Sequence, residues 1–178
     1  MLRAVFEIIM KNRKTVYLAM AALFAALTAA LTTVHLPLPS EAGYVHFGDA
    51  MIYIAASLLP APYSLMAAAV GGAMADAISG FINWVPFTFV IKAVNAVPFA
   101  LYHKYSKHKK IVTWQAFTMS LISGIITLVL YFFASWVVYG TAAGALADVP
   151  GSLVQAGGST VIFMIIGSII DRTKINRG

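Results

Sequence analysis

The sequence predicts an all-α integral membrane protein with six transmembrane helices, forming a single domain over residues 1–178. Hydrophobic residues make up 61% of the chain and charged residues only 10%, whereas a soluble domain is about half apolar and about a quarter charged. So few charges cannot cover a water-exposed surface. Because a spanning helix uses about 20 residues, the chain accommodates six spans with short loops and no soluble ATPase domain.

The predicted spans follow from the apolar segments in chain order. The first apolar segment is too long for a signal peptide and five others follow it, so we expect a span and not a cleaved signal. Residues 1–14 are predicted to form either an amphipathic helix on the membrane surface or a frayed terminus. The second segment is short for a span. The six spans are predicted near residues 15–34, 45–59, 63–81, 84–102, 114–139 and 153–170.

Helix-breaking residues and basic residues separate these segments. Pro60 and Pro62 divide the second segment from the third, because proline does not readily continue a helix. The stretch from Gly80 to Asn83 divides the third from the fourth. The fourth segment leads into a basic loop, and the sixth leads into a basic C-terminus.

The basic residues also predict the topology. Eleven of the 12 Lys and Arg residues lie before the first span, between the fourth and fifth, or after the sixth. With six spans these regions share one side, and the positive-inside rule makes both termini cytoplasmic. The opposite loops contain Glu41 and Asp148 and no Lys or Arg. We therefore expect a multi-pass protein of a bacterial cytoplasmic membrane. Its basic residues would lie at the membrane surface and anchor the topology. They lack the interleaved aromatics of a nucleic-acid site.

Several kinds of chemistry are excluded by the residues present. The chain has no cysteine, so it forms no disulfides, thiolate metal sites or cysteine nucleophiles. The His46-x-x-Asp49 spacing lacks the second histidine of a metal motif, and no P-loop occurs. We expect no cofactor, no metal and no enzymatic activity, since no catalytic constellation is present.

The twelfth basic residue, Lys92, lies inside the fourth predicted span. Eight residues separate it from Trp84, which places it roughly 12 Å below the outer surface. Asn95 is three residues further and shares its helix face. An ionisable group at this depth predicts a functional site.

Other polar and aromatic residues gather in the same outer half, while the inner halves of the spans have almost no ionisable groups. A cation, carboxylates, amides and aromatic rings together suit a small, flat, polar heteroaromatic ligand. The predicted substrate-binding residues are Tyr44, His46, Asp49, Asp76, Asn83, Trp84, Lys92, Asn95, Trp136, Tyr139, Gln155 and Ser159.

Structural alternatives exist for several of these residues. Trp84, Trp136 and Tyr139 also suit an interfacial aromatic belt. Asp76 is also compatible with a structural ion pair to Lys92, and Asp49 with a cap on the second span.

The first span carries alanines at four-residue spacing, which form a smooth surface for another helix. The alternatives are internal packing or alanine as a simple helix former. The predicted docking residues are Ala21, Ala22, Ala25, Ala26 and Ala29.

Three motifs resemble the substrate-binding S components of energy-coupling factor (ECF) vitamin transporters. They are G-D-x-x-x-x-x-A-x-x-L-x-P from Gly48, G-x-x-x-x-D from Gly71 to Asp76, and P-x-T-x-x-x-K from Pro86 to Lys92. The chain is most similar to the riboflavin-type family and, within it, to the hydroxymethylpyrimidine/pyridoxine branch. The resemblance covers about residues 15–105 by motif, and the remainder by topology.

This resemblance implies a six-helix S-component bundle that binds one vitamin near the outer face. Its partners would be the transmembrane EcfT subunit and two cytosolic ATPases, with ATP used by those partners alone. The alanine face of the first helix would dock on EcfT, and the loop His35–Gly48 would close over the ligand. Transport would proceed by toppling of the S component in the membrane. The mixed charge of the site favours a neutral or zwitterionic ring compound, including pyridoxine, hydroxymethylpyrimidine and riboflavin.

Two other classes of function remain open from the residues. One is a stand-alone secondary transporter of a small polar heteroaromatic compound, although no inverted repeats are evident. The other is a structural subunit in which Lys92 and Asp76 only pair.

Overall fold

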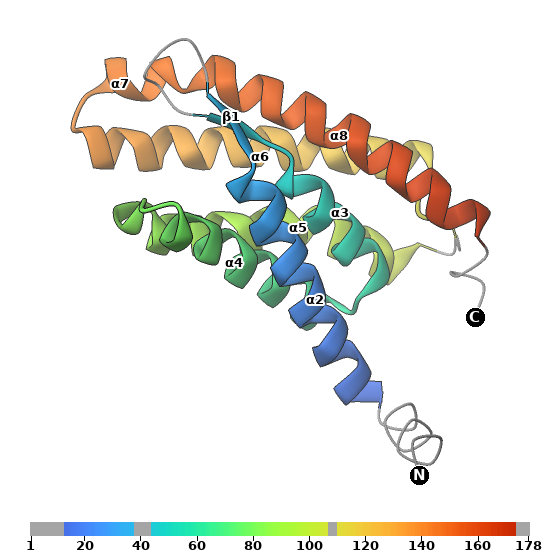
Figure 1. The fold of residues 1–178 in the computed structure, drawn as a ribbon. Helices are drawn as coiled ribbons and strands as arrows, with labels where there is room; N and C mark the ends of the chain where they lie inside the picture. Colours follow the sequence, from blue (N-terminus) through green and yellow to red (C-terminus); the bar gives the residue numbers. More distant parts are fainter. Residues whose placement is uncertain (1–12, 38–43, 107–109, 174–178) are drawn as a thin grey trace.

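A computed structural model describes residues 13–37, 44–106 and 110–173 (Figure 1). The segment predicted as an amphipathic helix or a frayed terminus, residues 1–14, lies almost entirely outside the described residues. Within the described residues the fold is almost entirely helical, as predicted. The long helices are α2 (Arg13–Thr33), α4 (Ala61–Ile78), α5 (Val85–Tyr105), α6 (Trp114–Tyr139) and α8 (Val149–Arg172). The shorter ones are α3 (Gly48–Leu58), α7 (Ala142–Ala147) and the 3-10 turn η1 (Ile82–Trp84).

Each of the six predicted segments corresponds to a helix, and residues 114–139 match α6 at both ends. Four stretches are long and apolar enough to cross a membrane: α2, η1 with α5, α6, and α7 with α8. These stretches support a multi-pass membrane protein. The shortest of the six, α3, is an apolar helix of 11 residues, which corresponds to about 16 Å and is well below the hydrocarbon thickness of about 30 Å.

The second predicted segment is shorter than expected because its first residues form a strand. Strand β2 (Tyr44–His46) pairs antiparallel with β1 (His35–Pro37), with Leu36 opposite Val45. This small hairpin and α7 were not predicted. The hairpin brings the chain from the end of α2 to the start of α3, so it lies directly before Asp49.

Helix α3 occupies the centre of the molecule, between α2, α4, α5 and α8 (Figure 1). All of its residues except Leu58 are buried. A helix that is apolar on every side is stable only when other elements surround it. Helix α3 can therefore be apolar all round and still too short to cross a membrane, because it packs against protein on all sides.

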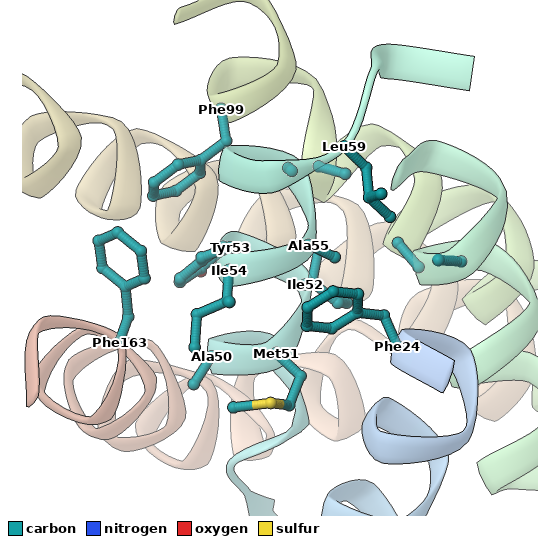
Figure 2. Close-up of a cluster of buried hydrophobic side chains, with 14 of the residues drawn as sticks. Phe24, Ala50, Met51, Ile52, Tyr53, Ile54, Ala55, Leu59, Phe99 and Phe163 are labelled. Carbon is teal, nitrogen blue, oxygen red and sulfur yellow. The ribbon is translucent and has the colours of Figure 1, made fainter. Parts of the chain in front are cut away.

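Aromatic rings fill the core between α3, α5 and α8 (Figure 2). Tyr53 stacks on Phe99 with ring centroids 4.8 Å apart, and Phe163 meets Phe99 edge-on at 5.0 Å. All three side chains are fully buried. Such ring pairs stabilise beyond the area that they bury. This cluster fixes α3 against α5 and α8, the helices that carry Lys92 and Gln155.

Helices α2 and α4 approach closely because Gly71 lacks a side chain. A Cβ atom at Gly71 would lie 2.7 Å from the Ala25 carbonyl oxygen and 2.8 Å from the Thr28 Cβ. Small residues permit this kind of contact between helices in membranes. One of the two alanine series of α2 is therefore used inside the chain.

The loop between α5 and α6 is tied to the end of α8. The backbone N–H groups of Ile111 and Val112 donate to the Asp171 carboxylate at 2.9 and 3.0 Å. Thr113 then caps α6 by accepting from the Ala116 N–H at 3.0 Å, as threonine favours at this position. At the other end of α6, Gly140 adopts a left-handed conformation with φ of 71°, which glycine accepts without strain.

Candidate functional site

The site is centred on a buried ion pair between α5 and α3. The Lys92 Nζ lies 2.6 Å from the Asp49 Oδ1, and the Gln155 Nε2 of α8 donates to the Asp49 Oδ2 at 3.0 Å. Lys92 is 0% exposed and Asp49 is 2% exposed. Three helices that are distant in sequence thus converge on one carboxylate, which supports the prediction that Lys92 lies in a built polar site.

The local sequence around Lys92 makes room for its side chain and places an aromatic ring near its charge. A Cβ atom at Gly72 would lie 2.6 Å from the Lys92 Cγ, so this glycine leaves space for the lysine stem. The Lys92 Nζ is 5.3 Å from the centre of the Tyr131 ring, within the range of a cation–π contact. The Tyr131 hydroxyl donates to the Thr88 Oγ1 at 3.1 Å. The ammonium is therefore held between a carboxylate and a ring.

Beside this pair lie buried polar atoms that have no hydrogen-bond partner among the described residues. They include both side-chain atoms of Asn95, the Tyr53 hydroxyl and the Ser159 Oγ. The Asn95 side chain approaches the Tyr53 hydroxyl, but the two groups do not meet strict hydrogen-bond geometry. Leaving one such group buried and unbonded costs about 1–3 kcal/mol. Several together, next to an ion pair, leave donors and acceptors that water or a ligand would bond to.

Two further predicted residues adjoin the same cluster. His46 is buried, and its Nδ1 accepts from the Gly48 N–H at 3.2 Å. Asp76 is 5% exposed and acts on Lys92 through its charge. The ion pair itself joins Lys92 to Asp49, so the alternative of a structural Lys92–Asp76 pair does not describe the main contact. Asp49 lies in the first turn of α3, where an acidic side chain is favourable, but its two oxygens bond to Lys92 and Gln155 and do not cap the helix.

The predicted aromatic residues separate into two environments. Trp84 contacts Tyr131 and Tyr139, with ring centroids 6.2 and 5.9 Å apart, which links the start of α5 to the ring above Lys92. Trp136 is 47% exposed and contacts Phe132, so it lies on the outside of α6, away from the cluster. Asn83 is also exposed. Tyr44 lies in β2, opposite Pro37.

Sequence reasoning missed Tyr53, Thr88 and Tyr131. Helical spacing was an available signal for two of them, because Tyr53 follows Asp49 by four residues and Thr88 precedes Lys92 by four. Tyr131 had no such signal, since its contact with Lys92 depends on how α6 packs against α5. These residues complete the cluster as a polar layer across α3, α5, α6 and α8.

The alanines of α2 divide between two faces. Ala21, Ala25 and Ala29 are buried within the chain. Ala22 and Ala26 are exposed, together with the large apolar side chains of Leu23 and Leu27. The second series therefore presents small residues on the outside of the bundle.

Comparison with known proteins places these features in a family. The model of the ECF-type riboflavin transporter S component matches residues 12–172. The chain belongs to this family. It is also similar to an uncharacterized protein, in gap 3' region, of Pyrococcus woesei, with 31% identity over 148 residues, covering 83% of this chain and 95% of that protein.

Membership of the family defines the general role of the chain. S components are the substrate-binding subunits of ECF transporters, and they work in association with other transporter components. The family is one of transporter subunits and not of enzymes, which agrees with the expectation from the sequence. The polar layer around Lys92 is therefore a candidate for the substrate site of a membrane transporter.

Proposed function

We propose that this protein captures a small water-soluble vitamin in the cluster around Lys92 and Asp49, for import by an ECF-type transporter. The observation that carries the proposal is the buried Lys92–Asp49 pair beside the unbonded side chains of Asn95 and Ser159. A membrane protein gains nothing in stability from such a group of polar atoms. A ligand with several donors and acceptors would bond to them.

The substrate class follows from the charges and rings of the site. Lys92 and Asp49 balance one another, which favours a neutral or zwitterionic compound over a strongly charged one. Asn95 offers one donor group and one acceptor, and the ring of Tyr131 offers a stacking surface. Hydroxymethylpyrimidine or a pyridoxine-like compound is our preferred substrate. Riboflavin, named in the family description, is the second.

Delivery of the substrate is proposed to follow the pattern implied by the resemblance. The six-helix bundle would span the bilayer with the short α3 enclosed within it and both termini in the cytoplasm. The connection between α2 and α3 would close over the ligand from the outer face. The β1–β2 hairpin supports this, since β2 runs directly into the buried His46 and then Asp49. Toppling of the whole bundle in the cytoplasmic membrane would then expose the site to the cytoplasm.

The partners in this proposal are EcfT and two ATPases, which would supply the energy. Ala22 and Ala26 are the part of the predicted docking surface that is exposed on α2. Small residues at this spacing let a partner helix approach closely. Ala21, Ala25 and Ala29 would support docking only indirectly, by fixing α2 against α4.

Calorimetric titration of the purified protein against a panel of B vitamins tests the proposal. We expect one vitamin to bind tightly, and Lys92→Met to weaken that binding while the protein stays folded. Absence of binding across the whole panel would contradict the substrate class. Uptake by the lone chain in liposomes, driven by a proton gradient, would instead favour a stand-alone secondary transporter.

A further inference from the structure

A groove between α5 and α6 lies toward the other end of α5 from Trp84, and its lining on α5 begins at Pro98, beyond Lys92 and Asn95. It has a volume of about 590 Å³ and is lined by Pro98, Leu101, Tyr102, Tyr105, Ser106, Gln115 and Met119. We propose that this groove binds one anionic phospholipid, with an acyl chain along the groove and the headgroup at its mouth. The site is separate from the proposed vitamin site and does not depend on it.

The lining of the groove changes from apolar to polar along its length. Helix α5 ends at Tyr105 and α6 begins at Trp114, so the mouth lies where these two ends meet. Pro98 is seven residues before Tyr105, which places it about 10 Å deeper. The deep part is formed by Pro98, Leu101 and Met119, and Ser106 and Gln115 lie at the mouth. An amphiphile whose chain runs parallel to the helices matches this gradient.

The mouth lies at the expected level of lipid headgroups. The two candidate spans that form the groove, Ile82–Tyr105 and Trp114–Tyr139, meet at this end. Tyr105 is 73% exposed and Trp114 is 76% exposed. Exposed tyrosine and tryptophan at span ends are typical of the membrane interface. The deep part of the groove therefore faces the hydrocarbon region.

Positive charge at the mouth favours an anionic headgroup. The Lys104 Nζ lies 5.3 Å from the centre of the Tyr105 ring, which holds the ammonium over a residue of the groove. His103 and Lys110 are also exposed at this end, and the Asp171 carboxylate beside the loop is bonded to the Ile111 and Val112 N–H groups. Basic recesses between spanning helices bind anionic lipids in this way. A zwitterionic lipid would gain much less from the same charges.

Native mass spectrometry of the full chain tests the proposal, with phosphatidylglycerol and phosphatidylcholine as the probes in matched mixed micelles. We expect the wild type to retain one phosphatidylglycerol, with a preference over phosphatidylcholine of roughly fivefold, as one favourable surface charge implies. Met119→Trp fills the groove and should abolish retention of both lipids. Lys104→Gln should keep binding but remove the preference.

The controls carry the same changes outside the groove. Leu121→Trp lies on an exposed position of α6, and Lys14→Gln removes an exposed lysine of α2; both should behave as wild type. If Met119→Trp fails to fold, Leu101→Trp obstructs the groove from α5. Equal retention of the two lipids by the wild type, or unchanged retention by a folded groove-filling variant, would overturn the proposal. Loss of assembly with the partner subunits in Met119→Trp, without loss of lipid, would assign the groove to a protein helix instead.

Discussion

At the scale of single residues, the site depends on a few side chains whose positions are costly for stability. Asn95 is 0% exposed and neither its amide nitrogen nor its carbonyl oxygen has a partner among the described residues. The backbone carbonyl of Asn95, unlike its side chain, is bonded: it accepts from the Ser123 Oγ at 2.9 Å. The penalty is therefore confined to the Asn95 side chain, which can be removed without disturbing the contact between α5 and α6.

Asn95→Leu is expected to stabilise the protein and weaken vitamin binding at the same time. Removing the unbonded amide should raise the free energy of unfolding by about 1 kcal/mol, while affinity should fall at least roughly tenfold, since a ligand hydrogen bond is lost. Thermal unfolding and calorimetry on the same sample measure both. Ser123→Ala is the matched control and should leave the affinity unchanged. A destabilised Asn95→Leu protein with normal affinity would show that the amide has a structural role.

Gly72 offers a second test, through the position of Lys92. In Gly72→Ala the new Cβ would lie 2.6 Å from the Lys92 Cγ and 3.0 Å from the Thr88 Cγ2, so the stem of the lysine must shift. We expect a loss of about 1–3 kcal/mol in stability and a clear loss of affinity. Gly157→Ala is the control, because nothing lies within 4 Å of that site, and alanine there should stabilise α8 by about 0.5–1 kcal/mol. Normal vitamin affinity in Gly72→Ala would separate Lys92 from recognition.

At the scale of elements, helix α2 presents alanines on two different faces. Its buried face, with Ala25, packs against Gly71 of α4. Its exposed face carries Ala22 and Ala26. The sequence showed both alanine series but not which one the chain itself covers, because that depends on the rotation of α2 relative to α4.

Substitutions on the two faces of α2 should therefore have different effects. Ala22→Leu and Ala26→Leu should preserve stability and vitamin binding but prevent assembly with EcfT and the ATPases, as measured by co-purification and by uptake. Ala25→Leu, on the buried face, should instead lower stability by about 1–3 kcal/mol through overpacking. Assembly at the wild-type level in the double variant Ala22→Leu/Ala26→Leu would argue against this docking surface.

The elements themselves were predicted to different degrees. Helix α6 was predicted to the residue, because a long apolar run between Thr113 and Gly140 has clear ends. Helix α3 was placed correctly, but its start was predicted too early. Nothing in the sequence separates Tyr44–His46 from the apolar segment that follows, yet these residues pair as a strand with β1. The place of Lys92 within an apolar helix was predictable from the sequence, whereas its bond to Asp49 required the packing of α3 against α5.

At the scale of the whole molecule, the exposed surface and the interior follow opposite rules. Large apolar side chains such as Leu18, Val137 and Val161 are exposed, as a lipid solvent allows. Lys92, Asp49 and Asn95 are buried at the centre. The composition already indicated the first property. The burial of charged and polar side chains was predicted only as a concentration of polar residues in the outer half of the spans. The sequence does not state which of them face inwards, and Asn83 and Trp136 are exposed.

The pairing of Lys92 with Asp49 also has an electrical consequence. If the bundle topples as proposed, these two charges cross the membrane together, and the pair transfers no net charge. A single elementary charge would instead couple the step to the membrane potential by about 2.3 kcal/mol per 100 mV. Relative to the wild type, Asp49→Asn makes the net charge of the toppling bundle more positive by one, and Lys92→Met makes it less positive by one.

Uptake by the assembled transporter in proteoliposomes, measured while the potential is set by a potassium gradient and an ionophore, should therefore change its voltage dependence in opposite directions in these two variants. The double variant Asp49→Asn/Lys92→Met should return to the voltage dependence of the wild type even where its affinity does not recover. An identical voltage response in both single variants would mean that the pair does not cross the field. In the wild type, a contact of 2.6 Å between two side chains would thus make the transport step independent of these charges at any membrane potential.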